Sequence, residues 1–161
     1  MAIHKLSLGE FDEVDYYLIA IHTLLEDYRL AYFINQKLPI ILSKSSNEIQ
    51  VSTKVGETFF SRFSFFENEN EVNWDLIQNK NEITHLTNST SQNLFLNVPM
   101  EVSTKVFLLP EFKKVDYFLK IEHNDSINLE ATQRTLNTIE NVSTVYAISK
   151  NKIKSKNNLI F

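Results

Sequence analysis

The sequence predicts an α+β domain with a mainly antiparallel or mixed sheet and two helices on one face. A repeat is the first reason: EFDEVDYYLIAIH at 10–22 returns as EFKKVDYFLKIEH at 111–123, with seven of thirteen positions identical. In both copies a strand-like run precedes a helix-like segment, and a strand-rich stretch lies between the copies. Strands and helices in this mixed order favour an α+β architecture.

The chain has the size of one domain. Its 161 residues are 43% hydrophobic and 12% aromatic, which is enough to build a single core. We expect strand–helix–strand units at about 10–55 and 110–149, a β-rich insertion at about 57–109, and a basic tail at 150–161.

The first unit begins with VDYYLIAI at 14–21, which is apolar on both alternating faces and therefore predicts a central strand. Thr23 and Glu26 have the spacing of a capping box. We expect a helix over 24–38 that ends before Pro39, because proline disfavours helix in the residue before it.

The second unit follows the same order. VDYFLKIE at 115–122 predicts a strand, and Asn124 stands where a helix N-cap is expected. The segment 142–149 predicts a further strand. The inward stripe of the intervening helix is formed by Leu129, Thr132, Leu136 and Ile139.

The insertion predicts a hairpin. ETFFSRFSFF at 57–66 and VNWDLIQ at 72–78 flank the acidic turn ENENE. The phenylalanines expected on one face are Phe59, Phe63 and Phe65. The polar segment 79–93 lacks periodicity and predicts a long loop.

Two strand–helix–strand units in series favour a split βαβ, or ferredoxin-like, arrangement with an inserted β-hairpin. In it the first strands of the units lie side by side at the sheet centre, and both helices cover one face. An irregular antiparallel sheet with two helices is the alternative.

One motif resembles a known family. LPEFKKVDY at 109–117 is similar to the signature of the IPExxxVDY family of uncharacterised bacterial proteins. Leu109 stands where the family has isoleucine, and the matching residues are Pro110, Glu111, Val115, Asp116 and Tyr117. The resemblance implies a small, single-domain bacterial protein and implies no activity.

Composition excludes several function classes. The chain has no cysteine and only two glycines, which lie far apart, so thiol chemistry and glycine-rich phosphate loops are excluded. With a net charge of −4 and only three arginines among sixteen basic residues, nucleic acid is an unlikely partner. We expect no cofactor, no metal, no membrane span and a cytoplasmic location.

The repeated aspartates Asp15 and Asp116 are unusual, because aspartate is depleted in strands. If the two strands pair in parallel, the carboxylates become neighbours. They could then bind a cation or support proton transfer. The alternative is that each aspartate lies in solvent or pairs with a lysine.

His22 and His123 close the two copies of the repeat. Each lies seven residues after its aspartate, so the two side chains of a copy face opposite sides of a regular strand and do not form a simple metal site. The histidines would lie beside helix N-termini, where they either meet an anionic ligand or pack against the first turn.

Tyr17 and Phe118 are expected on the sheet face away from the helices, covered by the phenylalanine hairpin or by a partner. We therefore predict a non-enzymatic interaction or assembly module that associates with itself or a protein partner through this aromatic sheet face. One alternative is a small-ligand or cation-binding protein, or a hydrolase, using Asp15 and Asp116. A second is an RNA-binding module.

Overall fold

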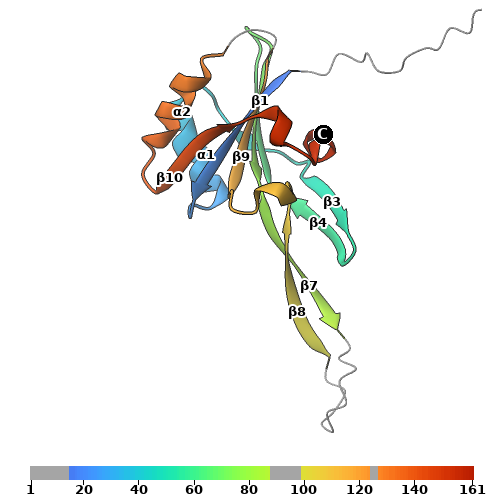
Figure 1. Ribbon diagram of the computed structural model, residues 1–161. Helices are drawn as coiled ribbons and strands as arrows, with labels where there is room; N and C mark the ends of the chain where they lie inside the picture. The colour runs from blue at the N-terminus through green and yellow to red at the C-terminus, as the bar shows by residue number, and fades with distance from the viewer. Residues whose placement is uncertain (1–14, 88–98, 124–126) are drawn as a thin grey trace, which may run out of the picture.

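The computed structural model describes residues 15–87, 99–123 and 127–161. A six-stranded sheet carries both helices, and a two-stranded arm projects from it (Figure 1). The prediction of an α+β fold with a largely antiparallel sheet is confirmed. No helix in the described ranges combines the length and the apolar character needed to cross a membrane.

The main sheet has the strand order β10-β1-β9-β6-β5-β2, and all its neighbouring strands are antiparallel. Its strands are β1 (Tyr16–Thr23), β2 (Ser43–Lys44), β5 (Arg62–Glu67), β6 (Val72–Gln78), β9 (Tyr117–Glu122) and β10 (Val142–Ile148). Two further antiparallel pairs are β3 (Ile49–Thr53) with β4 (Gly56–Phe60), and β7 (Lys80–Thr87) with β8 (Met100–Phe107). The helices are α1 (Asp27–Lys37) and α2 (Leu129–Asn137), and the 3-10 turns are η1 (Pro110–Phe112), η2 (Lys150–Lys152) and η3 (Lys156–Leu159).

The first core cluster lies between the sheet and the helices. Leu30 and Ile34 of α1 and Leu136 of α2 are fully buried there against side chains such as Ile19 and Leu119. Both helices therefore cover the same face of the sheet.

A second core cluster lies on the other face, and segments of the same chain cover it. Phe118 and Leu18 from the sheet meet Leu109 beside η1 and Leu159 from the C-terminal segment, all at most 2% exposed. This face is not an open surface.

The start of α1 differs from the prediction. Thr23 belongs to β1, and its hydroxyl accepts a hydrogen bond from the Leu25 amide rather than capping a helix. The helix begins at Asp27, after Glu26. The predicted cap Asn124 lies outside the described residues, whereas the Asn128 side chain caps α2 by accepting from the Ala131 amide at 3.0 Å.

The insertion contains the predicted β5–β6 hairpin, but two details were wrong. Phe63 and Phe65 border the first core cluster, while Phe59 lies on β4 and is 46% exposed. Of the segment 79–93, predicted as a loop, residues 80–87 form β7 instead, and 88–93 lie outside the described residues. The polar composition of this segment is typical of a loop. It is also compatible with a strand here, because neither strand of a projecting arm needs to be strongly apolar.

Candidate functional site

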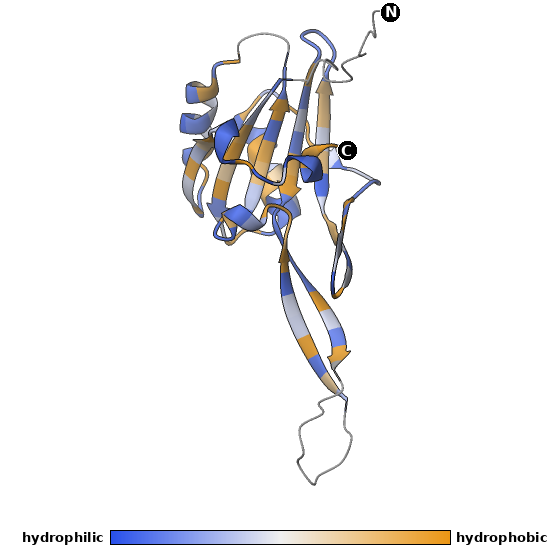
Figure 2. Ribbon diagram, turned by 45° about the vertical axis from the view of Figure 1, so that its right-hand side comes forward, coloured by the Kyte–Doolittle hydropathy of each residue, from blue (hydrophilic) through white to orange (hydrophobic). Residues whose placement is uncertain are grey.

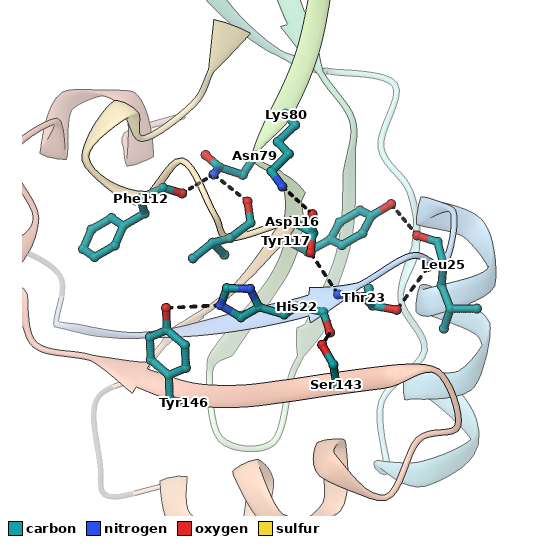
Figure 3. A network of polar contacts seen from close by, with 11 residues as sticks. His22, Thr23, Leu25, Asn79, Lys80, Phe112, Asp116, Tyr117, Ser143 and Tyr146 are labelled. Atoms are coloured by element: carbon teal, nitrogen blue, oxygen red, sulfur yellow. Dashed lines mark hydrogen bonds and ion pairs between the residues drawn. The ribbon is translucent and has the colours of Figure 1, made fainter. Parts of the chain in front are cut away.

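The motif at 109–117 encloses one buried side chain, Asn79, at the end of β6 (Figure 3). Its Nδ2 donates to the carbonyls of Phe112 at 2.9 Å and Val115 at 2.8 Å, and its Oδ1 accepts from the Leu109 amide at 3.0 Å. Its backbone also bonds the segment at Leu108 and Asp116. Asn79 is fully buried, so it fixes the path of the motif.

Glu111 ties the motif to the C-terminal segment. Its Oε1 accepts from the amides of Lys154 at 2.7 Å and Ser155 at 2.8 Å, and its Oε2 accepts from the Ser155 hydroxyl at 3.0 Å. Burial alone would raise the pKa of Glu111. These donors, together with its own backbone N–H, outweigh that effect and hold the pKa below its usual value.

The last motif residues hold the end of β1. The Tyr117 hydroxyl donates to the Leu25 carbonyl at 2.8 Å, and burial, then the nearby charges of Asp27, Asp116 and Glu26, raise the pKa of Tyr117. Asp116 accepts from the Thr23 amide at 3.0 Å and pairs with Lys80 at 2.7 Å. Leu109 and Val115 are buried, and Pro110 opens η1, a position where proline is favoured. Apart from Pro110, which is exposed, each of these motif residues is thus buried or hydrogen-bonded to another part of the fold.

The antiparallel pairing of β1 and β9 separates the repeated aspartates. Tyr16 lies opposite Glu122, and Ile21 lies opposite Tyr117, so Asp15 and Asp116 lie at opposite ends of the strand pair. Seven residues of strand span roughly 23 Å. Asp15 is 62% exposed and forms an ion pair with Lys150. The paired-carboxylate site would require parallel strands and is not formed.

The same pairing places each histidine beside the other copy's aspartate in the backbone ladder. The His123 amide donates to the Asp15 carbonyl at 3.1 Å. His22 Nε2 lies 3.2 Å from the Tyr146 hydroxyl (Figure 3). Over residues 15–87, 99–123 and 127–161, no group of three or more His, Asp or Glu side chains gathers closely enough to hold a metal ion.

Tyr17 and Phe118 occupy opposite faces of the sheet, so the predicted aromatic sheet face is wrong. Tyr17 packs on the helix side and stacks on His123 with ring centroids 4.2 Å apart, whereas Phe118 belongs to the second core cluster. Antiparallel strands place directly opposite residues on one face, and here Phe118 lies opposite Ala20. Equivalent residues of the repeat therefore face opposite sides.

A buried charged cluster, absent from the sequence-based candidates, lies on the second face. Arg62 Nε donates to Asp75 at 2.7 Å, and Lys120 bonds Glu122 and donates to the Leu159 carbonyl at 2.8 Å. Asp75 is fully buried. Burial raises its pKa, while the hydrogen bond and charge of Arg62 oppose that effect. Through its hydrogen bond to the Leu159 carbonyl, Lys120 helps to hold the C-terminal segment in place.

The arm formed by β7 and β8 projects from the domain (Figures 1 and 2). Its base packs on the second core cluster through Val106 and Ile83. Side chains alternate between its two faces. One face lacks charged side chains: along it the paired register places Asn81 with Val106, Ile83 with Thr104, and His85 with Val102. The opposite face carries Lys80, Glu82, Leu86, Glu101 and Lys105.

Apolar side chains near the outer end of the arm are exposed. Leu86 is 64% exposed, Met100 60% and Val102 37%, whereas Val106 near the base is buried. No sequence pattern had marked the arm as a candidate surface. The alternation of Ile83 and His85 with polar neighbours was the available signal.

Comparison of the chain with known protein families, curated proteins and solved structures finds no match.

Proposed function

We propose that this protein is a non-enzymatic assembly module that associates with a second copy of itself through the uncharged face of the β7–β8 arm. The observation that carries the proposal is the arm itself: two eight-residue strands that project from the domain, with an uncharged face whose base is buried against the domain and whose outer part is exposed. A lone two-stranded hairpin is marginally stable in water. Covering one of its faces would stabilise it.

Charge limits where two copies of the chain can meet. The chain carries a net charge of −4, so two copies repel each other across most of their surfaces. The outer part of the uncharged face, with His85 and Val102, brings no like charges together. A two-fold symmetric interface must be complementary to itself, and an uncharged strip of β-branched side chains meets that condition.

The motif supports a non-enzymatic role. The side chains of Glu111, Asp116 and Tyr117 are engaged in folding contacts with Ser155, Thr23 and Leu25, in that order. The two aspartates considered for catalysis lie at opposite ends of a strand pair. The resemblance to the IPExxxVDY family implies no activity and stays a prediction.

We also infer that the sheet is an extended split βαβ arrangement. In the order β10-β1-β9-β6, the first strands of the two units are neighbours, and both helices border one core cluster. On this interpretation β2 to β5 and the arm are additions to the basic unit.

The proposal is tested by two matched lysine substitutions on opposite faces of the arm. Val102→Lys places a charge on the uncharged face, and Leu86→Lys places one opposite Glu101 on the charged face. Light scattering after gel filtration, at micromolar protein, should show a dimer for the wild type and for Leu86→Lys, and a monomer for Val102→Lys. A monomeric wild type, or equal effects of both substitutions, would contradict the proposal.

A further inference from the structure

A groove of about 710 Å³ lies between the end of α1, the β5–β6 turn and α2, away from the arm. This volume is typical of ligand sites. Its apolar walls include Leu38, Pro39, Ile127 and Ala131, and Trp74 of β6 also lines it. A ligand with an apolar body could pack against these walls.

The rim of the groove is acidic. Glu67, Glu69 and Glu71 all line it, and no lysine, arginine or histidine is among its lining residues. Glu67 accepts a hydrogen bond from the Asn70 side chain at 3.2 Å, which leaves its carboxylate charge in place. A concave surface with charges of one sign concentrates ligands of the opposite sign.

Trp74 lies in the lining of the groove. It is 7% exposed, and its indole Nε1 is buried with no hydrogen-bond partner in the described ranges. A ligand in the groove cannot reach an atom without accessible surface, so the N–H takes no part in binding, and Trp74 contributes an apolar ring to the lining of the groove.

We infer that this groove binds an extended peptide segment that carries lysine or arginine. The basic head would meet the glutamates of the rim, because ammonium and guanidinium groups form charge-assisted hydrogen bonds with carboxylates. The aliphatic stem would pack along Leu38, Pro39 and Ile127. The indole ring of Trp74 would add an apolar contact. This inference is independent of the arm and of self-association.

The groove can be probed directly, because Trp74 is the single tryptophan of the chain. We would titrate the full chain with an acetylated, amidated Lys-Leu-Lys peptide and follow tryptophan emission, with Glu-Leu-Glu of the same form as the control ligand. The expected result is a saturable change with the lysine peptide alone. It should weaken as salt screens the charges.

Variants separate binding in the groove from general attraction to an acidic protein. The double variant Glu67→Gln and Glu69→Gln should weaken binding several-fold, whereas Glu101→Gln on the arm should leave it unchanged. An absent emission change, an equal response to the acidic peptide, or equal effects of the double variant and Glu101→Gln would overturn the inference.

Discussion

Replacing Asn79 with alanine should be strongly destabilising. The substitution removes three side-chain hydrogen bonds and leaves the Val115 carbonyl and the Leu109 amide without this partner, whereas the Phe112 carbonyl still accepts from the Val115 amide. A buried group left unsatisfied costs about 1 to 3 kcal/mol, so the two together cost about 2 to 6 kcal/mol. This is a large fraction of the 5 to 15 kcal/mol, roughly, that stabilises a typical domain.

The measurement is denaturant unfolding followed by the emission of Trp74, which is buried at 7% exposure. The control is Asn157→Ala, which truncates an exposed asparagine of the C-terminal segment and should change the free energy of unfolding by less than about 0.5 kcal/mol. If Asn79→Ala lost less than about 1 kcal/mol, the motif would not be organised around Asn79 and our structural explanation of it would fail.

Three further predictions concern charged groups. Asp116→Ala should lower the free energy of unfolding by about 1 to 2 kcal/mol, because the Thr23 amide loses its acceptor. Asp15→Ala should lower it by less than about 0.5 kcal/mol, since the ion pair of Asp15 is exposed. Equal losses would contradict the asymmetry of the repeat. Glu111 has a lowered pKa, so its contribution is present above the ordinary glutamate value of about 4.3 and is lost as pH falls below it. The stability difference between wild type and Glu111→Gln should therefore shrink in acid, and a constant difference would count against the lowered pKa. Arg62→Met should lower the free energy of unfolding by about 3 kcal/mol at neutral pH, because it leaves Asp75 unpaired. Because burial raises the pKa of Asp75, this loss should diminish as pH falls and Asp75 becomes neutral. A larger loss in acid would refute this explanation. Each is measured by denaturant unfolding across a pH series.

Much of the fold follows from local patterns. The runs at 14–21 and 115–122 are apolar enough to be central strands, and they are neighbours in the sheet. The β5–β6 hairpin follows from its alternating aromatics and acidic turn. These features depend on a few consecutive residues, so periodicity detects them.

Strand direction could not be predicted from the repeat. Whether Asp15 meets Asp116 depends on parallel or antiparallel pairing, which is set by how the whole chain connects. The same choice decides whether Tyr17 and Phe118 share a face. The sequence therefore marked these four residues of the repeat as candidates but did not predict which of them lie together.

The residues that organise the candidate surfaces carry weak local signals. Asn79 lies in the polar run NKNE, and its importance comes from carbonyls more than thirty positions away. The arm resembles a loop because its exposed strands need few apolar side chains. Trp74 lies in a recognisable strand, but only the packing of α1 and α2 places it beside a groove.

Hydrogen exchange with peptide-level resolution tests the central claim, self-association through the arm, most directly. The account predicts that amides of 80–87 and 100–107 exchange more slowly as protein concentration rises, while those of β9 in the sheet centre stay unchanged. Slowing confined to the arm would place the interface there. Arm exchange that does not depend on concentration, measured under conditions in which a dimer forms, would contradict the account.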